Sequence, residues 1–427
     1  MNKVLPLISL FIISIISIFY WTLKSKNELY DAKWNAPDTT LAITINGEIS
    51  TTFPTTNAYT GTVECTTGTG KVEWNGTKWV LTTSGITKGN TKCNAIFNKL
   101  TFAETILANN EVKTPITTPG ATISTASEAL LASTPDDYGT SYYFRGAVTN
   151  NYVEFANKCW RIVRVGGDGS VKLILHNDNT AGVANPCNSA NNSTSAAFAR
   201  YSGTTYTSAF NENCDDNAYV GFMYGTPGSS TYAASHANTN KSTILTNLET
   251  WYNNTLKTYE SVIDDTVWCN DKTNVTDTSY NPNIRGGNAT GLGYGINKTY
   301  YGATQRLVST SGSAGGTGPS LKCNGELSKI NSKVGLITAD ELVFAGYAYN
   351  IGNSTTYLQE NAADNEWWSL SPNLFNGGNA IVFIMYSGYF IDDFVYHTYG
   401  VRPSISLVSS ITISGGSGSS EAPYVVK

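Results

Sequence analysis

The sequence is poor in charge, in histidine and in paired cysteine motifs, and each shortage excludes a class of function. Charged residues make up 14% of the chain, whereas a soluble protein usually has about 25%. The formal net charge of -5 argues against nucleic-acid binding, which needs a basic face. The 3 histidines, His176, His236 and His397, leave little scope for a catalytic triad or a histidine metal site. No C-x-x-C pair occurs, so zinc and thioredoxin-type sites are poor interpretations.

Uncharged polar residues and tyrosine take the place of the missing charges. Thr, Ser and Asn are frequent, and the chain has 39 glycines and 26 tyrosines. This composition is typical of extracellular, β-rich surface proteins. A chain of 427 residues also exceeds the usual size of one domain, so we expect two or more folded units.

The chain has 7 cysteines, and in an exported protein we expect most of them to form disulfides. Pairing neighbours in sequence gives three candidate bonds: Cys65 with Cys93, Cys187 with Cys214, and Cys269 with Cys323. Cys159 is then left over, and its apolar, strand-like surroundings predict a buried free thiol. The sequence alone does not fix the connectivity.

The N-terminal residues predict a membrane anchor. Residues 4–23 are almost wholly apolar and are long enough to cross a bilayer. No small-x-small cleavage site follows them, which favours an uncleaved signal-anchor transmembrane helix at 1–24 over a removed signal peptide. We therefore expect a single-pass protein of the cell membrane with its C-terminal bulk outside the cell. A juxtamembrane linker is expected at 25–38.

Residues 39–99 predict a small all-β sandwich that acts as a spacer. Leu41, Ile43 and Ile45 alternate onto one face before an Asn-Gly turn, and a second Asn-Gly turn follows Trp74. Short strands separated by such turns are typical of small antiparallel sandwiches. No residue pattern in this region indicates chemistry.

Residues 100–135 are rich in Thr, Ala and Pro and predict a linker with one short helix at 124–131. The remaining residues, 136–427, predict one large domain. It begins with strands, including a run at 152–165, and two long loops follow. We expect a helix capped by Ser242 that runs to about Lys257. A second helix is expected after the capping box of Thr338 and Glu341.

Three motifs give the large domain a resemblance to a known family. Gly335 to Glu341 is similar to the R-L-P-T-E-A-E-W helix start of that family, although its Arg and Pro are missing. Trp367 to Pro372 is similar to a W-W-x-R-S-P block, with Leu370 where Arg is usual. Gly400 to Pro403 is similar to a G-x-R-P terminal strand. The domain thus resembles the C-type-lectin-like fold, in the bacterial branch of formylglycine-generating-enzyme-like domains and the variable proteins of diversity-generating retroelements. The whole chain also resembles membrane-anchored surface proteins of gut Firmicutes.

The resemblance implies an α+β fold in which two helices flank a small twisted antiparallel sheet with long loops. Formylglycine-generating enzymes bind copper through a late pair of cysteines, and no cysteine follows Cys323 here. The calcium-binding motifs of lectins with this fold are also missing. Asp392 and Asp393 are adjacent, so on a strand they point to opposite faces and cannot act together as acid and base. We therefore predict no enzyme, no cofactor and no metal site.

The stretch from Glu366 to Leu407 is the predicted recognition surface, with an unknown protein or glycan as its ligand. It contains two strand-like runs rich in aromatic residues, which are the commonest binding anchors. The candidate ligand-binding residues are Asn373, Phe375, Asn376, Asn379, Tyr389, Ile391, Asp392, Asp393, Phe394, Tyr396, His397 and Tyr399. Most of them are reachable from an Asn codon by mutation of its adenines, as in diversity-generating retroelements. One hypothesis is therefore a receptor-like or adhesin-like variable protein.

Other interpretations of this stretch remain open. One is an ordinary core hairpin in a structural cell-envelope protein without a specific ligand. Another is a calcium-independent carbohydrate-binding protein. Exposure provides the test: residues that bind, such as Tyr389, Phe394, Tyr396 and Tyr399, must be mostly accessible on one connected surface.

Overall fold

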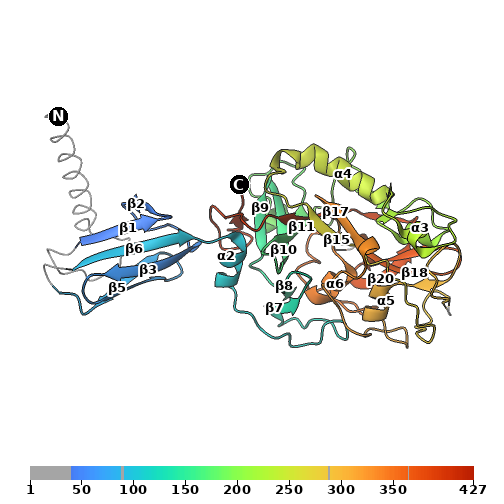
Figure 1. The fold of residues 1–427 in the computed structure, drawn as a ribbon. Helices are drawn as coiled ribbons and strands as arrows, with labels where there is room; N and C mark the ends of the chain where they lie inside the picture. The colour runs from blue at the N-terminus through green and yellow to red at the C-terminus, as the bar shows by residue number, and fades with distance from the viewer. Residues whose placement is uncertain (1–39, 88–90, 287–288, 364) are drawn as a thin grey trace, which may run out of the picture. The chain divides into compact units, whose positions relative to one another are not determined.

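The computed structural model describes residues 40–87, 91–286, 289–363 and 365–427 (Figure 1). The chain folds into two compact units, and the boundary between them lies between Ile106 and Leu107. We refer to the parts before and after this boundary as unit 1 and unit 2. The predicted anchor at 1–24 and the predicted linker at 25–38 lie outside the described residues.

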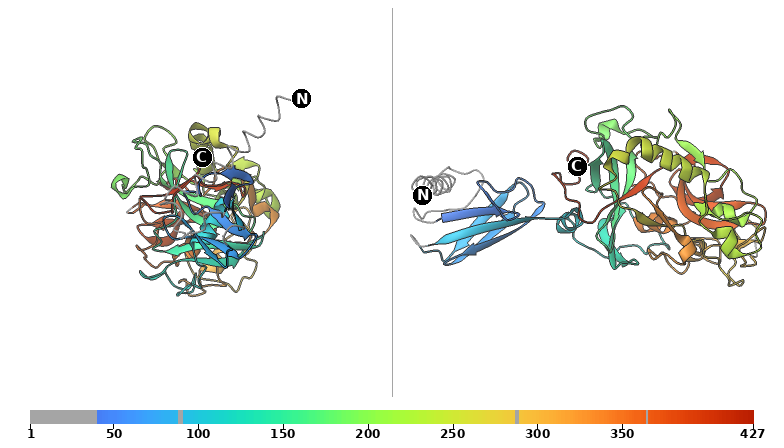
Figure 2. Two further views of the ribbon diagram at one scale, coloured as in Figure 1. Left: turned by 90° about the vertical axis from the view of Figure 1, so that its left-hand side faces the viewer. Right: turned by 45° about the horizontal axis from the view of Figure 1, so that its top comes forward.

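Strands dominate the structure, which is 35% strand and 14% helix. The helices are α2 (Phe102–Asn109), α3 (Tyr232–His236), α4 (Thr243–Thr255), α5 (Gly302–Leu307) and α6 (Ala339–Ala345). Short 3-10 helices lie at Ser189–Asn191, Asn217–Val220, Lys257–Tyr259 and Glu326–Ser328. Among the described helices only α4, with 13 residues, is longer than two turns or so. Figures 1 and 2 show it running along the outside of unit 2.

The predicted α+β class, with two helices on one small sheet, is therefore wrong. The physical reason lies in the composition: Thr, Asn, Ser and Gly are poor helix formers, whereas Thr and Tyr suit a pleated strand. The two expected helices do exist. Ser242 caps α4 through a bond from the amide of Leu245, and Thr338 and Glu341 form the predicted capping box of α6. They are minor parts of a mostly β protein.

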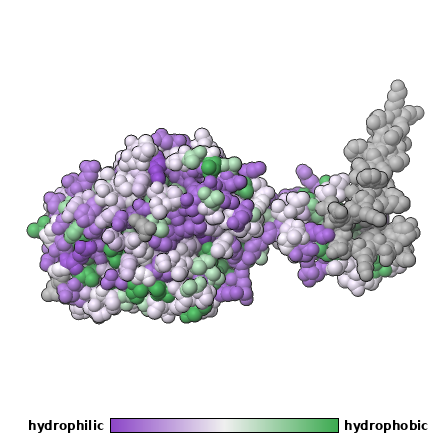
Figure 3. Space-filling view, turned by 180° about the vertical axis from the view of Figure 1, so that it is seen from behind, coloured by the Kyte–Doolittle hydropathy of each residue, from purple (hydrophilic) through white to green (hydrophobic). Residues whose placement is uncertain are grey.

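The surface of the molecule mixes residue types. On the face drawn in Figure 3, hydrophobic residues occur in small groups among hydrophilic ones. Scattered apolar residues of this kind are normal and do not by themselves indicate a docking site. A binding site must therefore be found from particular side chains and their contacts.

Unit 1 consists of a four-stranded sheet and a separate hairpin. Its strands are β1 (Thr40–Ile45), β2 (Glu48–Ser50), β3 (Tyr59–Cys65), β4 (Thr69–Trp74), β5 (Trp79–Ser84) and β6 (Lys92–Lys99). The sheet has the order β2-β1-β6-β3, with β1 parallel to β6, and β4 pairs with β5. Asn46 and Gly47 have φ of 51° and 83°, as a type I′ hairpin turn requires. The predicted turn is confirmed.

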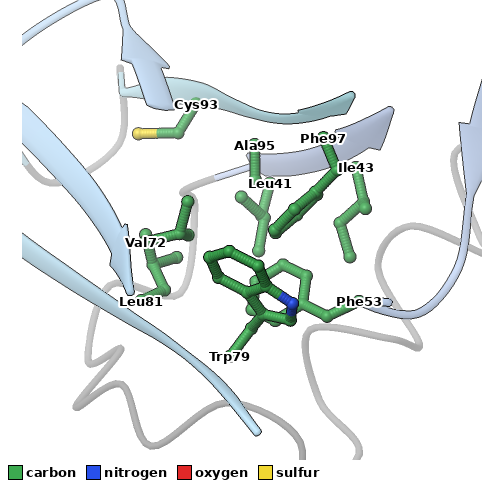
Figure 4. Packing of buried hydrophobic residues seen from close by; sticks show 9 residues of the cluster. All are labelled: Leu41, Ile43, Phe53, Val72, Trp79, Leu81, Cys93, Ala95 and Phe97. Carbon is green, nitrogen blue, oxygen red and sulfur yellow. The ribbon is translucent and has the colours of Figure 1, made fainter. Parts of the chain in front are cut away.

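The sheet and the hairpin of unit 1 share one hydrophobic core (Figure 4). Its buried members are Leu41, Ile43, Phe53, Val72, Trp79, Leu81, Cys93, Ala95 and Phe97. The two layers approach closely at Gly61, where a Cβ would lie 2.6 Å from Val72 Cγ2. The predicted disulfide between Cys65 and Cys93 is confirmed, and it joins β3 to β6.

Unit 2 contains two larger sheets and two short pairs of strands. The strands of the first sheet are β7 (Ala129–Pro135), β8 (Thr140–Gly146), β9 (Tyr152–Phe155), β10 (Lys158–Val165), β11 (Val171–Asn177), β22 (Ser404–Leu407) and β23 (Tyr424–Val425). Its main path is β22-β11-β10-β8-β7, and β9 pairs with both β10 and β23. The strands nearest the C-terminus, β22 and β23, thus belong to the same sheet as the first strands of the unit.

The second sheet carries most of the predicted recognition stretch. Its strands are β12 (Thr207–Ala209), β16 (Thr299–Tyr300), β18 (Trp367–Phe375), β19 (Ala380–Tyr386), β20 (Tyr389–Phe394) and β21 (Thr398–Gly400). The order is β12-β21-β18-β19-β20, and β16 also pairs with β18. The short pairs are β13 (Met223–Tyr224) with β14 (Asn240–Lys241), and β15 (Thr266–Cys269) with β17 (Lys329–Ser332).

Two local predictions fail in this unit. Residues 129–135, expected in a linker and partly in a helix, form β7, which pairs with β8 along its whole length. The run at 152–165 is two strands, because Ala156 and Asn157 both have positive φ and turn the chain back between β9 and β10. In both cases a short turn joins two neighbouring strands, β7 to β8 and β9 to β10, and the sequence pattern did not show where the turn lies.

The remaining disulfides correct the predicted pairing. Cys269 bonds Cys323 as predicted, but Cys187 bonds Cys159, and Cys214 is the free thiol. Cys159 begins β10 beside β9, and the Cys187 sulfur contacts the carbonyl of Val153 in β9. The sheet therefore brings Cys159 to Cys187 and leaves Cys214 elsewhere, next to Asn379.

Candidate functional site

The hairpin of β19 and β20 holds the candidate site at an edge of the second sheet. Tyr386 pairs with Tyr389 at its end, and Ser387 and Gly388 between them have φ of 48° and 86°. Such a turn matches the twist of the strands and fixes their register. The two tyrosines at its ends are 46% and 47% exposed. A rigid turn therefore presents a pair of aromatic side chains to solvent.

Alternation along β20 divides its side chains between interior and surface. Phe390 and Asp392 are buried, whereas Ile391 and Asp393 are half-buried and Tyr389 is exposed. Successive residues of a strand point to opposite faces, so Tyr389, Ile391 and Asp393 share the outer face. The two adjacent aspartates do point apart, as the sequence predicted.

Asp393 organises the polar part of the outer face. Its Oδ2 accepts hydrogen bonds from the Tyr399 hydroxyl and, at 2.9 Å, from Nδ1–H of His397. Tyr399 lies on β21, and His397 follows a tight turn at Val395 and Tyr396. Val395 is buried, and its carbonyl accepts from the amides of two residues in another segment. The turn is thereby fixed to the body of unit 2, and the His397 and Tyr399 side chains converge on one carboxylate.

An aromatic group lies beside these polar side chains. Phe394 and Tyr396 stack with ring centroids 5.6 Å apart and planes 14° apart. The His397 ring meets Tyr396 edge-on at 4.7 Å, and Arg285 lies over Phe394, 5.1 Å from its centroid. Stacked and edge-on rings attract one another beyond the effect of area alone. Tyr396 remains 42% exposed, so it is an accessible aromatic side chain that its neighbours hold in place.

Arg285 connects the two aspartates from a distant loop. Its Nε and Nη2 bond Oδ2 and the carbonyl of Asp392 at 2.9 and 2.7 Å. Its Nη2 also lies 3.5 Å from Oδ1 of Asp393. Tyr349 donates a further hydrogen bond to the buried Asp392. The Arg285 side chain is still 37% exposed, so part of it is available to a ligand.

The environment shifts the pKa values of these groups. Burial raises the pKa of Asp392, and this effect outweighs the bonds from Tyr349 and Arg285 that lower it. Burial also acts to raise the pKa of Asp393, but the hydrogen bonds from Tyr399 and His397 lower it overall. Burial and the Asp393 carboxylate raise the pKa of Tyr399 above its ordinary value. At neutral pH the outer face therefore carries an ionised Asp393 and a neutral phenol.

The arrangement is better suited to recognition than to nucleophilic chemistry. A His–Asp pair can orient an imidazole as a base, but it needs a nucleophile beside it. Among the described residues the hydrogen-bond partners of His397 are Asp393 and Tyr399. Tyr399 is a phenol whose pKa is raised, so it is a poor nucleophile. The absence of enzymatic activity stays a prediction.

The structure separates the predicted site residues into three groups. Tyr389, Ile391, Asp393, Phe394, Tyr396, His397 and Tyr399 are exposed or half-buried and lie around β20 and β21. Asn376 and Asn379 are half-buried in the turn between β18 and β19. Asn373, Phe375 and Asp392 are buried at 0%, 0% and 3% exposure. The prediction that these last three residues contact a ligand directly is wrong. Asn373 and Phe375 lie on β18, an inner strand with neighbours on both sides, and Asp392 faces inward.

Sequence reasoning missed Arg285 and Tyr386. Arg285 lies 107 residues before Asp392, in a loop whose only signal was an isolated cation among Gly and Asn residues. Tyr386 ends the preceding strand, and its pairing with Tyr389 was visible in the pattern Tyr-Ser-Gly-Tyr. We define the β20 surface as Arg285, Tyr386, Tyr389, Ile391, Asp393, Phe394, Tyr396, His397 and Tyr399.

A second concentration of charge lines a pocket between α5, α6 and the first sheet. We define the charged pocket by Arg164, Lys172, Asp271, Arg306, Asp340 and Glu341, which line it. Arg306 lies 2.6 Å from Asp271 and 2.8 Å from Asp340. Lys172 lies 2.7 Å from Glu341. Arg164, Lys172 and Arg306 each already have a carboxylate partner, so the geometry favours a structural role.

The part of the chain that the structure describes offers no helix of the length and apolarity needed to cross a membrane. The predicted single-pass location in the cell membrane therefore finds no support in the described residues, and the predicted anchor at 1–24 lies outside them. The three disulfides are consistent with an extracellular protein.

Comparison of the chain with protein-family models, with curated proteins and with solved structures finds no match. The family resemblance of the motifs at Trp367–Pro372 and Gly400–Pro403 therefore stays a prediction. The candidate site rests on its own geometry.

Proposed function

We propose that the protein is an extracellular ligand-binding protein, receptor-like or adhesin-like, which binds its ligand on the β20 surface. One observation carries the proposal: aromatic and charged side chains that are partly exposed are held in place by bonds among themselves. Tyr396 is stacked on Phe394, and Asp393 fixes His397 and Tyr399. Preorganised side chains lose little conformational entropy when a ligand binds.

The chemistry of the β20 surface suits a polar ligand with an apolar face. The exposed rings of Tyr386, Tyr389 and Tyr396 offer contact area together with hydroxyl groups. Asp393 accepts hydrogen bonds, and the exposed part of Arg285 donates them. A protein segment or a glycan presents such a combination, and both are kept as candidate ligands.

A binding screen with a matched set of variants tests the proposal. The purified protein is applied to glycan and protein arrays, and any ligand found is titrated against the double variant Tyr389→Ala/Tyr396→Ala. We expect at least a tenfold loss of affinity, because exposed aromatic anchors commonly contribute about 2 kcal/mol or more. Circular dichroism of the variant checks that its fold is retained.

Tyr138→Ala serves as the control. Tyr138 is 60% exposed but lies at the charged pocket, so its loss should leave the affinity unchanged. If Tyr138→Ala abolishes binding and the double variant does not, the ligand binds at the charged pocket and the proposal fails. If the double variant abolishes only self-association, the alternative of a structural cell-envelope protein is favoured.

We also propose that the outward positions of the β20 surface are those that sequence diversification would vary. Ile391, Tyr396 and His397 project from a fixed backbone, so replacing them changes the surface and not the core. The buried Asn373, Phe375 and Asp392 are outside this set. The test is genomic: an imperfect repeat of this coding stretch beside a reverse-transcriptase gene is expected, and finding none contradicts diversification without affecting ligand binding.

A further inference from the structure

A group of polar side chains at the first sheet of unit 2, one on β11 and two in loops beside it, is buried without hydrogen-bond partners. Both ring nitrogens of His176, the Tyr357 hydroxyl and Nη2 of Arg402 have no hydrogen-bond partner among the described residues. These three residues are at most 3% exposed. Leaving a buried donor without a partner costs about 1–3 kcal/mol, so three such residues in one place require an explanation.

Backbone contacts of Arg402 bring the three residues together. Its Nε donates to the carbonyl of Leu175, the neighbour of His176, and its Nη1 donates to the carbonyl of Leu358, the neighbour of Tyr357. The guanidinium therefore lies between the backbone of β11 and that of the loop after α6. Its third nitrogen remains in the same region as His176 and Tyr357.

The charges in this region do not balance. The carboxylate of Glu360 accepts from Arg161 at 2.8 Å, from Asn192 and from Tyr152, and its Oε2 lies 3.8 Å from Nε2 of His176. No carboxylate of the described residues lies within ion-pair distance of Arg402, whose remaining contact is the face of Trp367 at 4.9 Å. Burial lowers the pKa of Arg402 to about 10, which leaves it charged at neutral pH. One buried positive charge is left without a counterion.

His176 supplies a neutral donor beside this charge. Burial lowers its pKa well below the ordinary value, and the neighbouring Arg161 and Arg402 lower it further. A neutral imidazole still carries one N–H. The region thus offers a guanidinium N–H, an imidazole N–H and a phenolic O–H, and all three can donate.

We propose that Arg402, His176 and Tyr357 form an internal binding site for a small monovalent anion, of which chloride is the common example. Such an ion accepts all three donors and neutralises the unpaired guanidinium. The desolvation of a divalent anion such as sulfate or phosphate would be far more costly in a buried site. The site lies beside β11 of the first sheet and is independent of the β20 surface.

Crystals of the full chain grown or soaked in sodium bromide test the site without any substitution. An anomalous bromide peak within hydrogen-bond distance of Arg402 Nη2 and the Tyr357 hydroxyl is expected. Electron density in that place without an anomalous peak would mean that a water molecule satisfies the donors. That result overturns the proposal.

Thermal unfolding provides a solution test that compares sodium chloride with sodium gluconate at equal ionic strength. Chloride should raise the midpoint of unit 2 by several degrees in a saturable manner, because a ligand stabilises the state that binds it. Tyr357→Phe should weaken the apparent chloride affinity several-fold. Equal midpoints in the two salts, or an unchanged chloride effect in Tyr357→Phe, would contradict the site.

Tyr347→Phe is the matched control. Tyr347 is also buried, but its hydroxyl accepts from Thr356 and donates to Gln359. Its loss should lower the midpoint equally in both salts and leave the chloride effect intact. A control that also abolished the chloride effect would assign it to general packing and overturn the proposal.

Discussion

The charged pocket and the β20 surface are built from the same types of side chain but differ in exposure. Both combine arginine, carboxylates and a cation over an aromatic ring: Lys172 lies over Trp268, and Arg285 lies over Phe394. In the charged pocket the paired side chains are at most 20% exposed. In the β20 surface Arg285 and His397 are 37% and 40% exposed. The ion pairs of the charged pocket are enclosed by protein, whereas the charged side chains of the β20 surface are accessible to a partner.

This difference shows why a charged cluster by itself does not identify a binding site. In the charged pocket each cation is saturated by carboxylates, and removing one partner leaves an uncompensated buried charge. On the β20 surface, solvent screens the charges, so their contribution to stability is small. The same types of residue therefore contribute to folding in the charged pocket and are available for recognition on the β20 surface.

The largest expected effect comes from Arg306→Met in the charged pocket. It leaves Asp271 and Asp340 without their shared cation, so the free energy of unfolding of unit 2 should fall by about 3–5 kcal/mol. Hydrogen exchange of peptides from α4 and α6 measures it. The control is Lys241→Met, which breaks an exposed pair with Glu249 and should cost less than about 1 kcal/mol. Equal effects of the two variants would contradict the expected difference between buried and exposed ion pairs.

A pH effect of a few kcal/mol is expected from Glu341. Lys172 and Arg164 lower its pKa to about 2 in spite of burial, so its folded pKa lies below the unfolded one. Its contribution is then complete above about pH 4.5 and is lost as the pH falls toward 2. Urea titrations between pH 6 and pH 3 should show this loss for unit 2. In Glu341→Gln the dependence should become shallower, and an unchanged slope would contradict the assignment.

Burial acts in the opposite direction on Lys172, whose pKa falls to about 8 even though Glu341 raises it. A simple ion pair would raise the pKa of the lysine, whereas the pKa of Lys172 falls. Burial is the larger influence for Lys172, since 8% of its side chain is exposed. The dependence of the free energy of unfolding on pH below pH 6, which comes from Glu341, is the clearer test.

A smaller effect is expected from Asp393→Asn on the β20 surface. The variant keeps the shape of the side chain but weakens the bonds to His397 and Tyr399, and the partly exposed site should lose about 1 kcal/mol. The pKa of Tyr399 should fall, because the Asp393 carboxylate contributes to raising it. Ultraviolet titration of the tyrosines, with Tyr399→Phe to assign the signal, measures this. A cost as large as that of Arg306→Met would mean that the β20 surface is a structural element.

The smallest effect on stability is expected from Tyr396→Ala, within about 1 kcal/mol, because the ring is already 42% exposed. The same substitution should nevertheless weaken ligand binding. A large fall in stability without loss of binding would mean that Tyr396 contributes to folding and not to recognition, contrary to the role given to the β20 surface. Chemical denaturation and ligand titration of one sample give both quantities.

Local signals gave the reliable predictions from the sequence. Ser242 and Thr338 cap their helices as expected, and the Asn46–Gly47 turn has the expected conformation. Each depends on residues within about four positions of one another, so the sequence itself contains the determinants. The alternation of β20 likewise predicted that Asp392 and Asp393 point apart.

Other features depended on which strands pair. The sequence did not show that Cys159 bonds Cys187, that residues 129–135 form a strand, or that Asn373 lies inside an inner strand. The balance between helix and strand was also missed, although a composition rich in Thr and Tyr and in poor helix formers favours strands.

By itself the sequence determined the caps, the tight turns, the alternation of β20 and a composition suited to strands and to an extracellular setting. Only the tertiary structure decided which aspartate is buried and which is open, and it alone brought Arg285 to both of them from 107 residues away. The physical reason is that caps and turns are short-range hydrogen-bond arrangements. Burial and charge pairing are properties of the completed sheets, which form from segments widely separated in the chain.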